Sequence, residues 1–223
     1  MKTVFEGEVV DVLPINKGII IVYVHDITDN AMHISFKMVS FENGKVTVIP
    51  KSVYELSKFG TNYQTISMQA KNYIMSKAIL LPNGKYLIVD TDGTTKIVDS
   101  EGHTQWTGEL KYKGGAPSGI AVSGRTIWAC YKESRALVRV NITTMREELR
   151  IGGGNASPFD DPTDLFINGE KIYVCNSGTN AVLRVDLNTY AVEEYCKFDS
   201  PPKQFLTVDE YQFVVLKSGV YML

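Results

Sequence analysis

The segment TIWACYKESRALVRVNITTMREEL (residues 126–149) recurs 45 residues later as KIYVCNSGTNAVLRVDLNTYAVEEY (residues 171–195). Identical residues coincide at this offset without a gap, and they include the pairs Cys130 and Cys175, Arg139 and Arg184, Val140 and Val185, Thr144 and Thr189, and Pro117 and Pro162. Self-similarity at a fixed period of about 20–50 residues is the sequence signature of a repeat architecture.

Weaker copies of this unit lie on both sides of it. Asn83-Gly84-Lys85 follows Asn43-Gly44-Lys45 by 40 residues, and an apolar run follows each tripeptide, residues 86–89 and 46–49. With one residue inserted, residues 202–219 resemble residues 162–178. The chain therefore contains about five units, which we predict to span residues 31–72, 73–113, 114–158, 159–198 and 199–223.

Each unit predicts four short β-strands. In residues 159–198, runs rich in Val, Ile, Tyr and Phe alternate with turn residues, and the pair Asn168-Gly169 suits a tight hairpin because both residues adopt positive φ readily. Four-stranded units of this length are typical of propeller blades. The predicted fold class is all-β, a β-propeller with five blades. Six blades are the alternative, and they would need a further unit that the repeat alignment does not recognise.

The last unit, residues 199–223, is one strand short of a blade, while residues 1–30 contain strand-like runs of their own. An open sheet edge invites pairing with other chains. We therefore expect residues 1–30 to complete the last blade, so that residues 1–223 form a single domain.

The fourth unit resembles the repeats of NHL-type and YncE-like propellers. The shared pattern is a proline before the inner strand, an aromatic residue in the second strand, and a polar loop ahead of an Arg-Val pair; the matching residues are Pro162, Tyr173, Asn176, Asn180, Arg184 and Val185. The resemblance covers residues 114–198 and implies the fold, but propellers host unrelated activities, so it hardly constrains function.

Charge and composition exclude several classes of protein. Lys and Arg number 23 and Asp and Glu 25, a net charge of -2 that gives no global reason to expect nucleic acid or an anionic membrane as a partner. The longest apolar run, residues 18–24, is too short to span a membrane, and acidic residues interrupt the N-terminal segment where a signal peptide would be apolar. These features predict a cytoplasmic protein with reduced cysteines.

In a propeller, the loops between second and third strands emerge on one face. The repeat alignment places one residue of each unit at this position, and the five residues are Lys51, Thr91, Tyr131, Asn176 and Lys217, with Asp92, Lys132, Arg135 and Asn180 as the rim. Solvated loop residues also vary freely, which would explain their differences without a site. The alternative is a binding site, in which the basic residues favour an anionic ligand.

No catalytic constellation stands out, so we predict no catalytic residue, no metal and no cofactor. The favoured hypothesis is a non-catalytic binding or scaffold propeller that recognises a protein partner or an anionic small ligand through Lys51, Thr91, Tyr131, Lys132, Asn176 and Lys217. One alternative is a structural component of an assembly such as a virion. Another is a metal-dependent hydrolase or lyase whose central-channel cation is held by Asp164 and Asn176.

Similarity to virginiamycin B lyase-like propellers would imply a metal site built from His and Glu. The sequence contains only three histidines, which are His25, His33 and His103, and none of them lies in the third to fifth units. The sequence therefore does not predict that metal site.

Overall fold

A computed structural model of the chain describes residues 1–28, 31–42, 45–49 and 79–223. The chain divides into two compact units, one formed by Met1–Ile74 with Gln204–Leu223 and the other by Met75–Lys203. Within the described residues, no helix is long and apolar enough to cross a membrane.

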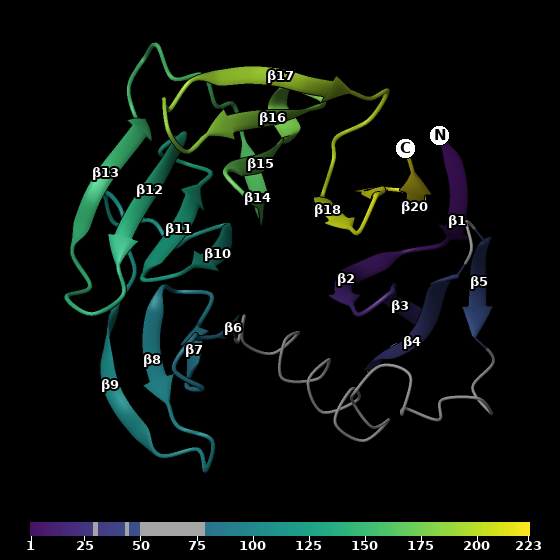
Figure 1. Cartoon of the computed structure of the whole chain (residues 1–223), viewed down its shortest axis with the longest axis horizontal. Coiled ribbons are helices and arrows are strands. Elements are labelled where there is room, and N and C mark those ends of the chain that lie inside the picture. The colour runs from purple at the N-terminus through teal and green to yellow at the C-terminus, as the bar shows by residue number, and fades with distance from the viewer. Residues whose placement is uncertain (29–30, 43–44, 50–78) are drawn as a thin grey trace. The chain divides into compact units, whose positions relative to one another are not determined.

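The unit Met75–Lys203 contains three antiparallel sheets of four strands, each with its strands in chain order (Figure 1). The second blade consists of β6 (Ile79–Leu80), β7 (Tyr86–Val89), β8 (Thr94–Val98) and β9 (Thr104–Glu109). The third consists of β10 (Gly119–Ser123), β11 (Thr126–Tyr131), β12 (Ala136–Asn141) and β13 (Glu147–Gly152). The fourth consists of β14 (Pro162–Asn168), β15 (Lys171–Asn176), β16 (Ala181–Asp186) and β17 (Val192–Lys197), with a short 3-10 helix, η3 (Ser177–Thr179), after β15.

The other unit contains two further four-stranded sheets. The first blade consists of β2 (Val9–Ile15), β3 (Gly18–Thr28), β4 (Ala31–Glu42) and β5 (Lys45–Ile49). The fifth joins β18 (Gln204–Val208), β19 (Tyr211–Leu216) and β20 (Gly219–Met222) to β1 (Lys2–Glu6) from the opposite end of the chain.

These sheets confirm the predicted fold class, an all-β propeller with five four-stranded blades in which an N-terminal strand completes the last blade. Strand β1 pairs with β20 from Lys2 opposite Met222 to Glu6 opposite Gly219 (Figure 1). The predicted boundaries at this end were wrong. Only β1 belongs to the fifth blade, and the first blade begins at Val9 and not at residue 31.

The physical reason for this error is that a turn signal specifies a hairpin but not its place in a blade. The similar Asn-Gly-Lys tripeptides precede β5 and β7, yet β5 is the fourth strand of its sheet and β7 the second. A tight turn needs the same residue types in either hairpin. The offset of 40 residues therefore aligned two different strands.

The strand pattern predicted for residues 159–198 is confirmed in β14–β17. The turn at Asn168-Gly169 is present but differs in detail. The ladder ends with Asn168 opposite Lys171, so the central residues are Gly169 and Glu170, and only Gly169 has a positive φ, of 56°.

The inner strands of the third blade are apolar on both faces because this blade packs against the second blade on one side and against the fourth on the other. In β11, Ile127 and Ala129 belong to the core between the second and third blades. The alternate residues Trp128 and Cys130 belong to the core between the third and fourth blades, around the fully buried Phe159. This alternation explains the near-continuous hydrophobic runs in the sequence.

Candidate functional site

The turns between second and third strands have the same backbone frame in all three blades of the unit Met75–Lys203. We call them the loop-face turns; they comprise residues 91–93, 132–135 and 177–180. Each contains a residue with positive φ whose carbonyl accepts a hydrogen bond from the chain leaving the fourth strand, and the three bonds are Leu110 N to Gly93 O (2.9 Å), Gly153 N to Arg135 O (3.0 Å) and Phe198 N to Asn180 O (2.8 Å). The frame therefore presents side chains at repeated positions.

The strand pairing shows that the predicted site residues occupy two different positions of this frame. Some are the last residue of the second strand, and the others are the first residue of the turn. Tyr131 and Asn176 are the last residues of their strands and pair with the first residues of the following strands. In the second blade the corresponding residue is Asp90, whose N–H bonds to the carbonyl of Thr94 at 2.8 Å, so Thr91 lies one residue further along. In the fifth blade, Leu216 ends β19 and Lys217 follows it.

This difference of one residue decides which side chains face solvent. Tyr131 is buried against Tyr112, with ring centroids 5.6 Å apart, and burial raises the pKa of its phenol. The fully buried Asn176 accepts a hydrogen bond from the N–H of Asp160 at 2.7 Å and donates one to Oγ1 of Thr179 at 2.8 Å. Both side chains therefore stabilise the loop-face turns from the protein interior and are not available to a ligand in solvent.

At the next position of the frame, Thr91, Lys132 and Lys217 are exposed. The equivalent Ser177 is half-buried, and its Oγ donates a hydrogen bond to the carbonyl of Pro202 at 2.9 Å. Lys217 belongs to the other compact unit. Lys51 lies outside the described residues, and because β5 just before it is a fourth strand, its alignment with Thr91 was wrong.

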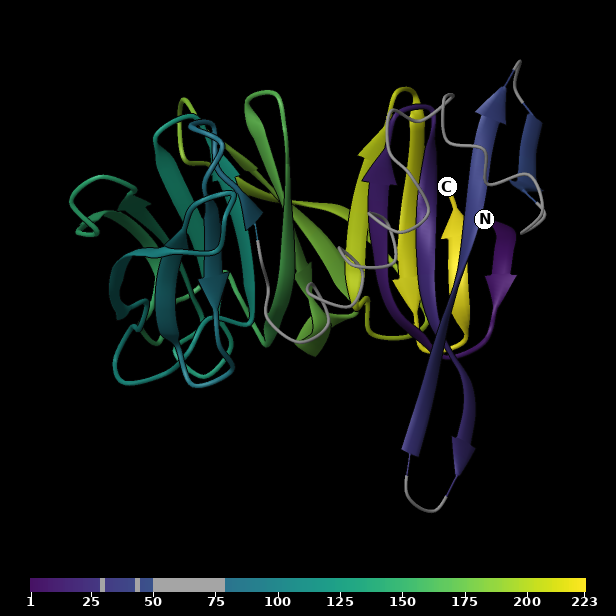
Figure 2. The ribbon, with the colours of Figure 1, turned by 90° about the horizontal axis from the view of Figure 1, so that it is seen from below.

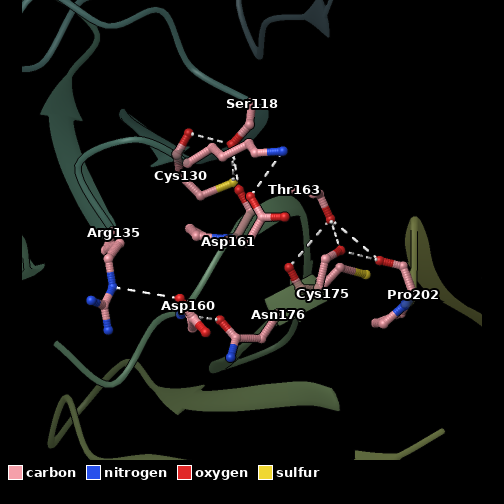
Figure 3. Close-up of polar contacts among 12 residues, drawn as sticks. Ser118, Cys130, Arg135, Asp160, Asp161, Thr163, Cys175, Asn176 and Pro202 are labelled. Carbon is pink, nitrogen blue, oxygen red and sulfur yellow. Dashed lines mark hydrogen bonds and ion pairs between the residues drawn. The ribbon is translucent and has the colours of Figure 1, made fainter. Parts of the chain in front are cut away.

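The two basic residues of the third blade's turn are paired with acidic residues that precede β14 (Figure 3). The Nζ of Lys132 lies 3.0 Å from Oδ1 of Asp161, and this hydrogen bond raises the pKa of Lys132. The Nε of Arg135 lies 3.7 Å from Oδ1 of Asp160. Both cations therefore have a carboxylate beside them, an arrangement that does not favour the predicted anionic ligand.

Beneath this face, two hydroxyl groups bond to backbone carbonyls of the following segment of the chain (Figure 3). Ser118 Oγ donates a hydrogen bond to the carbonyl of Pro162 at 2.6 Å, and Thr163 Oγ1 donates one to the carbonyl of Pro202 at 3.3 Å. Ser118 and Thr163 lie one repeat apart, each directly after a repeat proline. Sequence reasoning identified these prolines and missed the hydroxyls, although the offset of 45 residues aligns both.

The residues considered for a cation do not form a ligand cluster. Asp164 pairs with Cys175 in the β14–β15 ladder, and the side-chain oxygen of Asn176 already accepts the Asp160 N–H. Over residues 1–28, 31–42, 45–49 and 79–223, no group of three or more His, Cys, Asp or Glu side chains is placed to hold a metal ion.

Searches of protein families and of curated proteins find no match to this sequence. Among solved structures, a streptogramin B lyase is similar with a TM-score of 0.54 at 12% identity, over 97% of this chain and 64% of that one. Virginiamycin B lyase from Staphylococcus aureus is similar with a TM-score of 0.54 at 13% identity, over 92% and 72% of the two chains. Hydrazine synthase from Kuenenia stuttgartiensis is similar with a TM-score of 0.51 at 19% identity, over 63% and 42%.

What these proteins share with this chain is the propeller fold. At such low identity the likeness extends to no activity, because one fold hosts many functions. The chain also spans less than half of the hydrazine synthase chain, and 64% of the streptogramin B lyase chain.

Proposed function

We propose that this protein is a non-catalytic binding module that recognises a protein partner through its loop-face turns. The observation that carries the proposal is the repeated backbone frame whose exposed residue differs between blades, with Thr91 in the second blade and Lys132 in the third. Recognition residues in proteins lie preferentially on loops held by a rigid scaffold. Here the scaffold is repeated while the presented side chain changes.

The charges of this face favour a protein surface over a small anion. Lys132 and Asp161 form one exposed ion pair, and Arg135 and Asp160 form a second, longer one. Neighbouring charges of both signs are typical of the polar rim of a protein interface, where they give specificity and steer association. An anionic ligand would meet a carboxylate beside each cation, which weakens its attraction.

The test uses the double variant Thr91→Glu with Lys132→Glu, which changes two exposed positions of the loop-face turns. The matched control is Arg125→Glu, at the exposed hairpin before β11 and therefore at the other end of that strand. Partners captured by the immobilised wild-type protein are identified after crosslinking, and their affinities for the purified variants are then measured.

We expect the double variant to weaken the captured complex at least about tenfold, a loss of about 1.4 kcal/mol. The Arg125→Glu control should bind as the wild type does, and all three proteins should keep the same unfolding midpoint. Equal binding by the wild type and the double variant would contradict the proposal.

A thermal-shift screen against divalent metals, EDTA, nucleotides, sugars and phosphorylated metabolites provides an independent test. A small ligand that binds only the native state raises its stability by roughly 2.7 kcal/mol at a hundred times its dissociation constant. We expect no such shift. A clear rise of the unfolding midpoint with a metal or a metabolite would contradict the proposal of protein recognition and would indicate a small-molecule site instead.

A further inference from the structure

Beside the loop-face turns, two segments that lead from one blade to the next meet on the same face of the unit Met75–Lys203. The strands of this unit run between two opposite faces, at which the turns lie (Figure 2). The chain leaving β9 bonds to the turn carbonyl of Gly93, and the chain leaving β13 bonds to that of Arg135. Both segments therefore lie at the end of the strands where the loop-face turns are.

Two basic side chains of this region gather around the buried ring of Tyr112. The Nζ of Lys113 donates a hydrogen bond to the carbonyl of Gly153 at 2.7 Å and lies 5.5 Å from the ring centroid. Arg150, near the end of β13, donates a hydrogen bond to the Tyr112 hydroxyl, and its Cζ lies 5.2 Å from the same centroid. The ring and these hydrogen bonds hold both cations in place.

Glycine residues make this close approach possible. At Gly153, a Cβ atom would lie 2.9 Å from the Tyr112 hydroxyl, and the φ of 85° also disfavours any other residue. At Gly114 and Gly154, within the described part of the chain, no atom beyond the adjoining residues lies within 4 Å of the place where a Cβ would be. The backbone beside the two cations is therefore uncovered, and a partner can approach it.

Lys113 has a backbone conformation that the repeat does not require. Its φ is 50°, and with Gly114, at 81°, it turns the chain so that Tyr112 and Gly115 exchange two hydrogen bonds of 3.0 Å. One repeat later the corresponding residue is Pro158, whose ring excludes a positive φ. A lysine at positive φ is uncommon, and such conformations cluster at functional sites. This turn therefore indicates a role for Lys113 that is specific to this junction.

The two cations are not neutralised as those of the loop-face turns are. Among the described residues, Lys113 forms no ion pair, and its one hydrogen bond leaves further ammonium donors unused. Arg150 has Glu147 beside it, with Nε and Oε1 3.8 Å apart. Both basic side chains are exposed. The junction therefore presents an excess of positive charge with unused hydrogen-bond donors.

We propose that Lys113 and Arg150 bind carboxylate side chains of an acidic segment of the protein partner. This inference rests on the proposed function, and it assigns a chemistry to part of the partner's surface. An isolated anion gains little from exposed charges in water. A carboxylate carried by a partner that already contacts the loop-face turns gains specificity and faster association from the same charges.

The first test is the association rate of the complex with the captured partner, measured as a function of salt. The double variant Lys113→Gln with Arg150→Gln should lower the association rate constant about tenfold at low salt, because charges at the rim act mainly on encounter. The difference should disappear at about 1 M salt, where the screening length is about 3 Å. The matched control Lys96→Gln with Arg125→Gln removes the same charge at two other exposed positions and should associate as the wild type does.

A second measurement does not depend on the captured partner. Hexaglutamate is added to the isotope-labelled chain, with hexaglutamine and inorganic phosphate as separate controls. We expect hexaglutamate alone to shift the backbone amide signals of Gly114 and Gly154 in the NMR spectrum, and to shift neither in the double variant. No shift with hexaglutamate, or an equal shift with hexaglutamine, would overturn the proposal. An equal shift with phosphate would also overturn it and would indicate a site for free anions.

The failure of this inference is distinguishable from the failure of the proposed function. If Thr91→Glu with Lys132→Glu leaves the captured complex unchanged, recognition by the loop-face turns is wrong. If that variant weakens the complex while Lys113→Gln with Arg150→Gln associates like its control, only the acidic segment is wrong. Should the latter variant unfold at a lower midpoint than the wild type, Lys113→Gln alone takes its place, because it keeps the hydrogen bond from Arg150 to Tyr112.

Discussion

At the residue scale, Asn141 and Asp186 show how one turn is built with two chemistries. The side-chain oxygen of Asn141 accepts hydrogen bonds from the N–H groups of Thr143 and Thr144, at 2.9 and 3.1 Å. Asp186, one repeat later, accepts the equivalent bonds from the next turn, both at 2.8 Å. The hydrogen bond from Lys171, and then those from the turn's N–H groups, hold the pKa of Asp186 well below its usual value of 3.8.

We predict that Asp186→Asn lowers the unfolding midpoint at neutral pH, because the amide keeps the turn but loses the ion pair with Lys171. A carboxylate whose pKa is depressed in the folded state adds stability above its unfolded pKa, and this stability disappears as the pH falls through the folded value. The difference in unfolding midpoint between the wild type and Asp186→Asn should therefore disappear at strongly acid pH. Thermal unfolding as a function of pH measures it.

The matched control for this prediction is Asn141→Asp, which places a carboxylate in the equivalent turn. The position corresponding to Lys171 is there occupied by Thr126, so no cation is available to the new carboxylate from that position. The new carboxylate should gain only the part of the pH-dependent stability that the turn's N–H groups supply, and not the part that Lys171 supplies to Asp186. If the difference in unfolding midpoint between the wild type and Asp186→Asn stays constant with pH, Lys171 does not stabilise the carboxylate.

At the element scale, side-chain hydroxyl groups bond to backbone carbonyls of the segment that follows, in addition to the apolar packing, and Ser177 Oγ shares the Pro202 carbonyl with Thr163 at 2.9 Å. Ser118 connects the third blade to the carbonyl of Pro162, and Thr163 connects the fourth blade to Pro202. Neighbouring blades also share the two apolar cores of their unit. The Ser118 bond therefore joins the third blade to the first strand of the fourth, whereas the Thr163 bond holds the segment that leaves the fourth blade.

We predict that Ser118→Ala and Thr163→Val each lower the free energy of unfolding by about 0.5–1.5 kcal/mol, the usual net value of one hydrogen bond. The two effects should add, because the hydroxyls lie in different blades and bond to different carbonyls. Urea unfolding measures both. Thr107→Val, at an exposed position of β9, is the control and should change stability by less than about 0.5 kcal/mol. Two variants as stable as this control would contradict the role given to the hydroxyls.

At the scale of the whole molecule, the two ends of the chain meet in one blade. Strand β1 completes the fifth blade beside β20. Its Phe5 packs on Tyr23 of the first blade, with ring centroids 4.8 Å apart, and the Nζ of Lys37 lies 5.0 Å from the Phe5 ring. One strand therefore closes a sheet edge and packs on the neighbouring blade.

We predict that deleting residues 1–6 lowers the free energy of unfolding by more than Phe5→Ala alone, which should cost about 3–5 kcal/mol by loss of a buried aromatic ring. The additional loss arises because the deletion also exposes the edge of β20, which should promote aggregation. Urea unfolding and light scattering of the two variants separate these effects. A deleted protein with the wild-type midpoint would refute closure by β1.

The sequence alone determined the repeat, the strands within it and the fold class. The gapless offset between residues 126–149 and 171–195 was sufficient for the strands of the third and fourth blades, because strand alternation and turn residues are local properties. An incomplete last unit with strand-like residues before the first one was sufficient to predict closure by the N-terminal segment. These inferences need no knowledge of which strands pair.

Only the tertiary structure decided where the first blade begins and which loop residues face outward. The run at residues 46–49 follows the same turn signal as residues 86–89, but its partners make it a fourth strand, and local turn chemistry does not record that position. Tyr131 is buried and Lys132 exposed because the ladder ends between them, and Lys132 meets Asp161 because the blades pack side by side. Strand pairing and blade packing join residues distant in the chain, and no local pattern specifies them.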